Sequence, residues 1–283
     1  MIFDLSRQRF LRQAALGVGT LMLVAACGGT DPADTATDPA DAPEDAAAET
    51  GGSILVATEP AFPPFEFQAD DGSFTGFDID LMNAIGEAAG VTVEYESLPF
   101  DGIIPALQSG TVDAAISAMT ITAEREEVVD FSRPYFKAGL AIAVAEDNNE
   151  IASLDDLEGK AIAVQIGTTG AETANGIEGA TVSTFDSAPL ALQELANGNA
   201  DAVINDAPVT LDAINSGNIA GLKVVGELVT EEFYGIATPD GSDTVALINE
   251  GLATIIEDGT YAEIYQTWFG AEPPELPEES PVQ

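Results

Sequence analysis

The sequence predicts an α/β fold made of two similar lobes, and two observations carry this prediction. Short apolar runs typical of strands alternate with helix-length segments over residues 53–270, which favours largely parallel sheets with flanking helices. The stretches LQSGTVDAAI at 107–116 and LANGNADAVI at 195–204 share Leu, Gly, Asp, Ala and Ile at identical offsets. Each predicts a helix end, a glycine stop and a buried strand, so we interpret them as one unit that occurs once in each lobe.

Local patterns predict the individual elements. The apolar run at 53–58 predicts a strand, and the alternation of apolar and polar residues at 91–97 predicts a strand with one solvated face. Residues 77–90 predict a helix that stops at Gly90 and has one apolar face, formed by Ile79, Met82, Ile85 and Ala89. Further strands are expected at 139–145, 161–166, 201–204 and 222–225. Helix N-caps are expected at Ser187, Ser242 and Thr260, the last in a capping box with Glu263.

Residues 1–26 predict a secretory signal peptide. Three arginines lie within the first twelve residues and precede an apolar run, 14–26, that is too short to span a bilayer as a helix. Small residues then lead to Cys27, the only cysteine, and the stretch VAAC resembles a lipobox, whose cysteine becomes the lipidated mature N-terminus. We therefore expect an exported protein that is anchored by lipid on the extracytoplasmic side, in preference to a lone buried cysteine. Sec and twin-arginine export both stay open.

The segments on either side of the folded part are expected to be unfolded. Residues 27–52 contain seven acidic residues, no basic residue and two copies of TDPAD, a composition that cannot bury enough apolar surface to offset its ordering entropy. We interpret this segment as an acidic, disordered tether behind Cys27. The tail at 271–283 is rich in proline and glutamate and is expected to be disordered as well.

The chain is strongly acidic. Without residues 1–26, which hold three basic residues and one acidic residue, 48 acidic and 5 basic residues remain, a formal charge of −43. Such a field disfavours nucleic acid and anionic lipid surfaces as partners. It is also typical of a surface that stays hydrated in concentrated salt, so we predict a halophilic source.

This prediction has a direct test. We expect the purified protein to unfold at a higher temperature in about 2 M KCl than in dilute buffer, because a Debye length of about 2–3 Å screens the repulsion among its carboxylates. Circular dichroism melts at the two salt concentrations measure the difference. Equal melting temperatures would contradict the halophilic interpretation.

The strongest candidate for a ligand contact is Arg125. Thr122 is a suitable N-cap, which places Arg125 in the first turn of a helix, where the helix dipole disfavours a cation by about 0.3–1 kcal/mol. Its helical neighbours are Ile121, Thr122, Val128 and Val129, so no ion pair within the helix explains the position. Two interpretations stay open, a surface arginine paired elsewhere in this acidic chain, or a guanidinium that binds an anionic ligand.

Asp206 follows the second copy of the repeated unit, as residues 117–125 follow the first. Because Pro208 begins a helix, Asp206 taken alone is favoured as an N-cap, with a carboxylate that accepts a ligand ammonium as the alternative. Ligands of open α/β sheets bind at the carboxyl ends of the strands. A cation from one lobe and an anion from the other would suit a zwitterion in a cleft between them.

Two further stretches carry weaker signals. AIAVQIGTTG at 161–170 predicts a strand, a glycine turn and a helix whose amides could hold a carboxylate, although it lacks the Gly-Lys-Ser/Thr of a nucleotide-binding loop. At the end of the first strand, Glu59 lies beside three phenylalanines. Phe65 and Phe67 are expected in the core, while Phe62 could cover the apolar stem of a ligand together with Phe100, which opens a helix.

Taken together, these residues resemble the polar amino acid substrate-binding proteins of ABC importers, solute-binding protein family 3, and its glutamine-binding member closely. The shared stretches run in order from about 54 to 270: ATEPAFPPFEF, GFDIDLMNAI, FDGIIPALQSGTVDAAISAMTITAEREEVVDFSRPYFKAGL, AVQIGTT, ADAVINDAPV and GTYAEIYQTWFG. The resemblance implies a two-lobed, type II periplasmic-binding-protein-like fold. It also implies an amino acid ligand, delivery to an ABC transporter permease, no cofactor or metal, and a monomer.

The resemblance implies roles for ten residues of this chain. Arg125 would clamp the ligand α-carboxylate with added hydrogen bonds from Ser117, Thr120 and Thr168, and Asp206 would accept the α-ammonium. Phe62 and Phe100 would enclose the ligand side chain, whose polar end would face Glu59, Gln165 and Asn205. At these last three positions the glutamine-binding member has Asp, Lys and His. This chain keeps an acidic residue, Glu59, but lacks the lysine, which favours a ligand with a neutral or cationic side chain. Glutamine or a basic amino acid such as arginine or lysine is therefore expected, and an acidic ligand is not.

The resemblance also implies where the lobes meet. The family's two crossings between lobes fall near 135–140 and 230–236, which gives lobe 1 as 53–136 plus 236–270 and lobe 2 as 137–235. Arg133 and Lys137 lie beside the first crossing and are interpreted as structural or interlobe charges.

Two other functions stay open beside transport. A cyclohexadienyl dehydratase uses the same scaffold, and a fold does not fix a function. The chain has no histidine and its only cysteine is assigned to lipid, so we expect no enzyme, although catalysis by carboxylates stays open. A ligand-sensing module of a receptor is disfavoured because no membrane segment follows Gly270.

Overall fold

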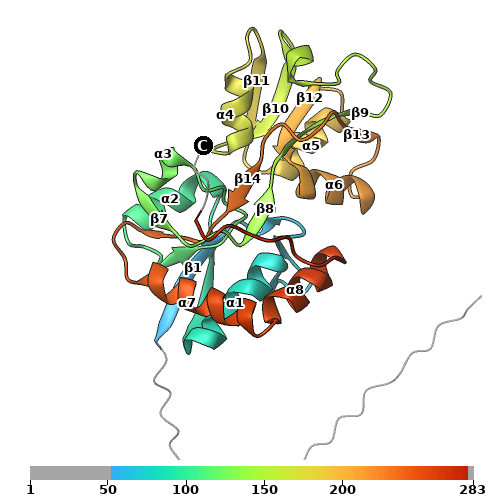
Figure 1. The fold of residues 1–283 in the computed structure, drawn as a ribbon. Coiled ribbons are helices and arrows are strands. Elements are labelled where there is room, and N and C mark those ends of the chain that lie inside the picture. The colour runs from blue at the N-terminus through green and yellow to red at the C-terminus, as the bar shows by residue number, and fades with distance from the viewer. Residues whose placement is uncertain (1–51, 280–283) are drawn as a thin grey trace, which may run out of the picture. The chain divides into compact units, whose positions relative to one another are not determined.

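The computed structural model describes residues 52–279, in which helices and strands alternate around two five-stranded sheets (Figure 1). The predicted signal peptide, Cys27 and the tether lie outside the described residues. The first sheet has the strand order β5-β1-β6-β15-β7. Its strands are β1 (Ser53–Thr58), β5 (Thr92–Ser97), β6 (Ala114–Ala115), β7 (Val129–Phe131) and β15 (Ala237–Pro239). Its helices are α1 (Phe77–Ala89), α2 (Phe100–Gln108), α3 (Ala123–Glu126), α7 (Thr244–Glu257) and α8 (Thr260–Phe269).

The second sheet has the strand order β11-β10-β12-β9-β13. Its strands are β9 (Leu140–Ala145), β10 (Ala161–Gln165), β11 (Thr181–Phe185), β12 (Ala202–Asp206) and β13 (Leu222–Val225). Its helices are the 3₁₀-helix Leu154–Leu157, α4 (Thr169–Asn175), α5 (Ala188–Ala196) and α6 (Ala207–Asn215). Within residues 52–279 no helix is both long enough and apolar enough to span a bilayer.

The expectation of largely parallel sheets is confirmed, with one antiparallel strand in each sheet. β1 is parallel to β5 and β6, and β10 is parallel to β11 and β12, but β15 and β9 run antiparallel to their neighbours. A parallel connection needs a crossover of about a dozen residues. β9 and β15 instead follow β8 (Phe136–Ala138) and β14 (Glu232–Tyr234) after one or two residues, so they enter their sheets in the opposite direction.

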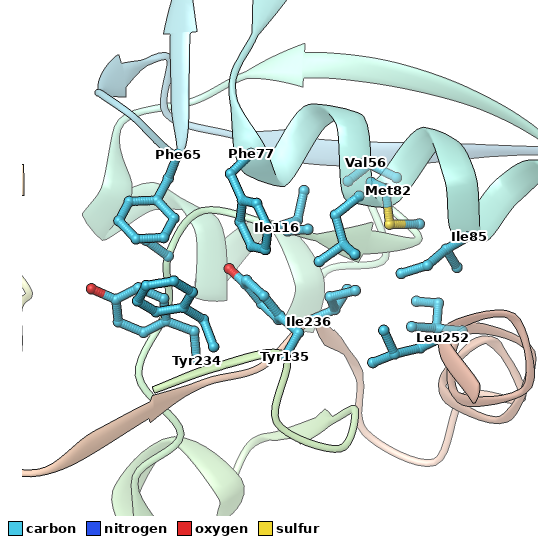
Figure 2. Close-up of a cluster of buried hydrophobic side chains, with 14 of the residues drawn as sticks. Val56, Phe65, Phe77, Met82, Ile85, Ile116, Tyr135, Tyr234, Ile236 and Leu252 are labelled. Atoms are coloured by element: carbon cyan, nitrogen blue, oxygen red, sulfur yellow. The ribbon is translucent and has the colours of Figure 1, made fainter. Parts of the chain in front are cut away.

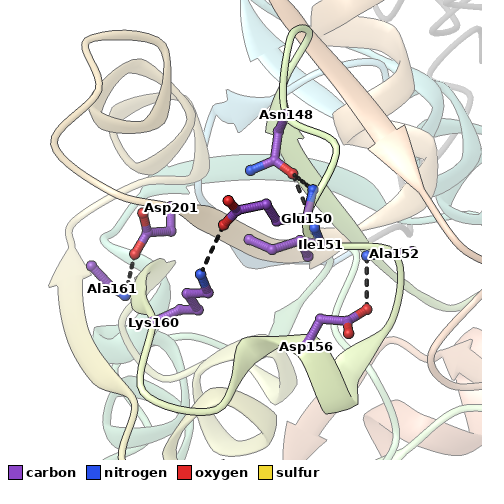
Figure 3. Close-up of polar contacts among 8 residues, drawn as sticks. All are labelled: Asn148, Glu150, Ile151, Ala152, Asp156, Lys160, Ala161 and Asp201. Carbon is purple, nitrogen blue, oxygen red and sulfur yellow. Dashed lines mark hydrogen bonds and ion pairs between the residues drawn. The ribbon is translucent and has the colours of Figure 1, made fainter.

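The repeated unit occupies equivalent places in the two sheets, which confirms that prediction. α2 and α5 each end shortly before a left-handed glycine, Gly110 with φ 67° and Gly198 with φ 76°, and the strands that follow pair with β1 and β10 respectively. The shared aspartate has the same function in both copies. Asp113 Oδ2 accepts from the Leu55 N–H at 2.8 Å, and Asp201 Oδ2 accepts from the Ala161 N–H at 2.8 Å (Figure 3). Each aspartate thus joins its strand to the start of the neighbouring parallel strand.

The two stretches where crossings are expected contain β8 and β14, which pair antiparallel as a separate two-stranded sheet (Figure 1). Lys137 in β8 forms an ion pair of 2.7 Å with Glu231, the residue before β14. The backbone N–H of Arg133 donates to Asn249 Oδ1 in α7 at 2.8 Å. Lys137 therefore joins the two crossing segments, while Arg133 contacts a helix of the first sheet.

An aromatic cluster packs the crossing strands against the helices of the first sheet (Figure 2). Phe65 is fully buried in the turn between β2 (Ala61–Phe62) and β3 (Glu66–Gln68), which pairs with β4 (Phe74–Thr75). Its ring lies 4.8 Å from that of Phe136 in β8 and 5.3 Å from that of Tyr234 in β14. Phe65 is thus a core residue, as predicted, and Phe67 is half-buried against Trp268.

Two of the three predicted N-caps are wrong, and the third, Ser187, is confirmed in position. Gly259 is the N-cap of α8, so Thr260 is already helical and the capping box with Glu263 does not form. Asp243 is the N-cap of α7, although Ser242 Oγ accepts from the Thr244 N–H at 3.2 Å and so satisfies a donor of the first turn. Ser187 is the N-cap of α5 but makes no side-chain capping hydrogen bond. In the tail, residues 271–279 form no helix or strand, and Leu276 packs against the first-sheet core.

Candidate functional site

One cavity brings together all ten residues that the sequence singles out. The space between its lining residues, part of which is open to solvent, is about 350 Å³. Its predicted lining residues are Glu59, Phe62, Phe100, Ser117, Thr120, Arg125, Gln165, Thr168, Asn205 and Asp206. Four further residues that the sequence analysis missed also line it: Ala118, Leu140, Thr169 and Gly170.

The cavity lies where parallel strands of both sheets end. Glu59 follows β1 and Ser117 follows β6 in the first sheet, whereas Gln165 ends β10 and Asp206 ends β12 in the second. The carboxyl ends of parallel strands are the usual place for ligands in α/β folds. Because the repeated unit places β6 and β12 equivalently, the chain delivers two similar edges to one cavity.

Arg125 is a buried cation, and the interpretation as a surface arginine is wrong. Arg125 is only 6% exposed. Its guanidinium donates to the carbonyls of Thr120 at 2.6 Å and Gly167 at 3.0 Å. It also lies 5.4 Å from the ring centre of Phe100, in cation–π geometry. Among residues 52–279 no carboxylate lies within 4 Å of the guanidinium. A buried cation without an ion pair is costly unless it meets an anion, so its position favours an anionic ligand group.

The helix that carries Arg125 is shorter than expected. Thr122 is its N-cap and accepts from the Arg125 N–H at 3.2 Å, as predicted, but α3 has only four residues. One turn has a small dipole, so burial rather than the helix dipole is what makes the position unusual. Burial lowers the pKa of Arg125, and the charges of Glu172, Glu232 and Asp206 counteract this effect.

Gly167 allows the second sheet to approach Arg125. It has φ +77°, and a Cβ there would lie 3.2 Å from Cβ of Asp101 in α2. Only glycine combines this left-handed conformation with so close a contact. The glycine turn predicted at 161–170 therefore serves to bring a carbonyl to the guanidinium.

Asp206 is a buried acid whose side chain does not cap its helix. It occupies the N-cap position of α6, but its Oδ2 accepts from the Tyr234 hydroxyl at 2.7 Å, and no capping hydrogen bond forms. Burial raises the pKa of Asp206 to about 7, with a smaller contribution from the charge of Glu232, while Tyr234 and Arg125 oppose the rise. The side-chain capping interpretation is thus wrong, and the carboxylate is directed to the cavity region shared with Arg125.

Glu59 and Gln165 meet across the cavity from the two sheets. Gln165 Nε2 donates to Glu59 Oε2 at 2.6 Å. Burial raises the pKa of Glu59 to about 7, and the hydrogen bond from Gln165 partly counteracts it. Arg125 and Asp206 line the same cavity, and the charge of each opposes the effect of burial on the pKa of the other. The cavity therefore has a zwitterionic end at Arg125 and Asp206 and a separate acidic end at Glu59.

Thr168 and Asn205 are engaged within the protein. Thr168 Oγ1 donates to the Gln165 carbonyl at 2.9 Å and accepts from the Ala171 N–H at 3.1 Å, so it caps α4. Asn205 Nδ2 donates to Thr210 Oγ1 at 3.2 Å. Their position beside the cavity was predictable from the strand ends, but what each would offer a ligand stays a prediction.

Two buried carboxyls behind the cavity were not predicted. Asp78 Oδ2 accepts from the Ala118 N–H and from the Tyr135 hydroxyl, both at 2.8 Å, and Ala118 has a left-handed φ of 44°. Ser117 Oγ donates to Glu66 Oε1 at 3.0 Å and accepts from the Glu59 N–H at 3.0 Å. Burial raises the pKa of Glu66 well above its usual range and that of Asp78 to about 6. These acids hold the strained backbone that forms one wall of the cavity.

The sequence and its fold match known proteins over most of the chain. Residues 54–271 match the bacterial extracellular solute-binding proteins, family 3. The L-cystine-binding protein TcyJ of Escherichia coli (strain K12) is 33% identical over 264 residues, which cover 92% of this chain and 96% of that protein.

Two solved structures of an ancestral arginine-binding protein are similar in both sequence and fold. The structure bound to arginine has a TM-score of 0.75 and 47% identity and covers 77% of this chain and 99% of that one. The structure bound to glutamine has a TM-score of 0.72 and 47% identity and covers 78% and 99%. With a family match over residues 54–271, this chain belongs to the bacterial extracellular solute-binding proteins, family 3.

Proposed function

We propose that this protein binds arginine, or else glutamine, between two lobes that close on it, and delivers the amino acid to an ABC importer. The observation that carries the proposal is the buried guanidinium of Arg125, which has no carboxylate partner within residues 52–279 and lines the same cavity as Asp206. One cation and one anion at the same end of a cavity match the two charges of an α-amino acid.

The proposed pose follows from the two ends of the cavity. The ligand α-carboxylate lies at Arg125, and its α-ammonium lies at Asp206. Its aliphatic stem passes between Phe62 and Phe100, and its polar end reaches Glu59, Gln165 and Asn205. Phe100 presents one ring face to Arg125, which leaves the other face for the stem.

Glu59 favours a cationic side chain over an acidic one. Its carboxyl is buried, and Asp101 adds further negative charge. A guanidinium there forms a charge-assisted hydrogen bond with Glu59, whereas a ligand carboxylate meets two acids. An amide side chain exchanges hydrogen bonds with Glu59 and Gln165, which is why glutamine is the second candidate. The structures of the ancestral protein with arginine and with glutamine support the same pair.

We also propose that lipid on Cys27 anchors the protein to a membrane and that residues 28–52 tether the binding part to it. The sequence of 24–27 supports this proposal. Mass spectrometry of the N-terminal peptide from the native membrane fraction tests it, since a diacylated Cys27 is expected and an unmodified Cys27 in a longer peptide contradicts it.

Calorimetry tests the proposed ligand. Titration with arginine, glutamine, lysine, histidine, cystine and glutamate should give micromolar or tighter binding for arginine or glutamine and no heat for glutamate. If none of the polar amino acids binds, the proposal fails.

A catalytic role has one observation in its favour. A carboxyl with a pKa of about 7 in a cavity, as at Glu59, suits a general acid or base. Incubation with prephenate, followed by chromatography, tests for the dehydratase reaction. We expect no turnover. Turnover of prephenate without amino acid binding would contradict the proposed transport function and favour a catalytic one.

Arginine binding should depend on pH more steeply than glutamine binding. The carboxyl of Glu59 has a pKa of about 7 in the ligand-free cavity, so it is mostly protonated at pH 6 and ionised at pH 8. Only the ionised form pairs with a guanidinium. Arginine affinity should therefore fall about tenfold more than glutamine affinity between pH 8 and pH 6, since one pH unit below the pKa leaves about a tenth of the group ionised.

The comparison of two ligands isolates Glu59. Asp206 also has a pKa of about 7, but it meets the α-ammonium that both ligands share, so it weakens both equally at low pH. In the Glu59→Gln variant the two ligands should show the same pH dependence. Parallel pH profiles for arginine and glutamine in the unmodified protein would remove Glu59 from the proposed pose.

A further inference from the structure

Glu232 is a buried carboxylate that contacts both sides of the ligand cavity without lining it. It lies in β14, and its side chain is 7% exposed. It lines a neighbouring cavity that shares Thr120 and Thr169 with the ligand cavity. We propose that Glu232 is a positioning residue that latches the two lobes in their closed arrangement. This inference rests on the proposed function, because a latch matters only if the lobes close on a ligand.

Three threonine hydroxyls donate to this carboxylate. Oε2 accepts from Thr120 Oγ1 at 2.7 Å and from Thr169 Oγ1 at 3.1 Å, and Oε1 accepts from Thr230 Oγ1 at 3.0 Å. Thr120 follows β6 of the first sheet, whereas Thr169 is the first residue of α4, which packs on the second. A single carboxylate oxygen thus receives one hydroxyl from each side of the cavity.

Thr230 extends the contact into the second sheet. Its Oγ1 also accepts from the N–H of Leu140 at 3.0 Å, and Leu140 opens β9 and lines the ligand cavity. Glu232 therefore has two routes to the second sheet and one to the first. Opening that separates the sheets must break the hydrogen bond to Thr120 or the one to Thr169. Because opening costs at least one of these hydrogen bonds to the buried carboxyl group, the contacts favour the closed arrangement.

The charge of Glu232, taken alone, predicts the opposite effect on binding. The charge of Glu232 opposes the lowering of the Arg125 pKa that burial causes. Removing that charge leaves Arg125 more attractive to a ligand carboxylate, which strengthens binding. Removing a latch weakens binding, and it does so by speeding dissociation, because the latch holds the closed arrangement that must open before a bound ligand can leave. The sign of the change therefore separates the two roles.

The Glu232→Gln variant, with L-arginine and L-glutamine as probes, tests the latch. Stopped-flow fluorescence should show dissociation about tenfold faster, with the association rate within about twofold, as expected for the loss of one charge-assisted hydrogen bond across the cavity. Thr169→Val removes one hydroxyl without changing the charge and should act in the same direction. Ligand dissociation from the double variant should be about as fast as from the faster of the two single variants, since both substitutions remove the same contact. Glu227→Gln, an exposed acid before β14, is the matched control and should leave both rates unchanged.

A ligand-free measurement separates the latch from the proposed function. Fluorophores attached at Glu87→Cys in α1 and Gln193→Cys in α5, both exposed positions, report the distance between the lobes. Without ligand, Glu232→Gln should shift the distance distribution to larger values. If neither arginine nor glutamine binds the unmodified protein, the proposed ligands fail, and this shift still tests the latch. If either ligand binds and Glu232→Gln leaves both the dissociation rate and the distances unchanged, or tightens binding, the latch is overturned.

Discussion

Replacing Arg125 with alanine should weaken amino acid binding by about 100-fold to 5,000-fold. The guanidinium is buried, has no carboxylate partner among residues 52–279, and lines the cavity beside Asp206. Removing one partner of a buried, hydrogen-bonded charge pair costs about 3–5 kcal/mol, because the remaining charge stays buried and unpaired. In the proposed pose the remaining charge is the ligand α-carboxylate. Calorimetry with arginine and glutamine measures the loss, which should be similar for both ligands.

Two variants sharpen this prediction. Arg125→Lys keeps the charge but cannot bind the two carbonyls and a carboxylate with one planar group, so its loss should be intermediate. Arg133→Ala removes a guanidinium from the same stretch of sequence but not from the ligand cavity, and its affinity should stay within about threefold. Thermal unfolding without ligand shows whether each variant is folded. Full-strength binding by a folded Arg125→Ala variant would overturn the proposed site.

The sequence predicted the place of Arg125 but not what holds it. The N-cap at Thr122 is a local signal, and the structure confirms it. The acceptor at Gly167 is 42 residues away, and its closeness depends on how the two sheets meet. A pattern along the chain cannot show such a contact. The length of α3 was not predictable either. The helix dipole singled out Arg125 correctly, although α3 is only one turn long and its dipole is small.

Local sequence patterns also do not predict the direction in which a strand runs in its sheet. An apolar run predicts that β9 is a buried strand but not which way it runs in its sheet. The repeated unit did predict the direction of β6 and β12. In each copy a helix ends and is followed by a strand that pairs parallel to an earlier strand, β1 or β10. β9 and β15 lack such a helix, which was visible in the sequence as the short spacing from the expected crossings.

The buried acids were hidden by the composition. With 49 acidic residues in the chain, a carboxylate in the sequence is usually solvated, so Glu66, Asp78 and Glu232 had no distinguishing signal. Their partners are the hydroxyls of Ser117, Tyr135 and Thr120, which lie 51, 57 and 112 residues away. Thr169 was missed for a smaller reason, since the neighbouring Thr168 was chosen at the same helix start and caps it.

Replacing Phe65 with alanine should destabilise the folded part by about 3–5 kcal/mol, the usual cost of removing a fully buried phenylalanine and leaving a cavity. Phe65 is 0% exposed, and its ring contacts aromatic rings from both crossing strands and from α8, with centre distances of 4.8 Å to Phe136, 5.3 Å to Tyr234 and 5.6 Å to Phe269. No neighbour can fill the space without leaving this cluster. Urea unfolding followed by circular dichroism measures the change.

Phe67→Ala is the matched control, because the same side chain two residues later is half-buried and contacts one aromatic ring, Trp268, at 6.0 Å. Its cost should be about 1–2 kcal/mol, in proportion to the apolar area that it removes from contact. Equal costs for the two variants would contradict the central position of Phe65. A large cost at Phe65 alone has a functional meaning as well, since the ring packs on β8 and β14 together. The segments that link the two sheets are then held by the same core that stabilises the first sheet, and weakening that core should also loosen the arrangement of the ligand cavity.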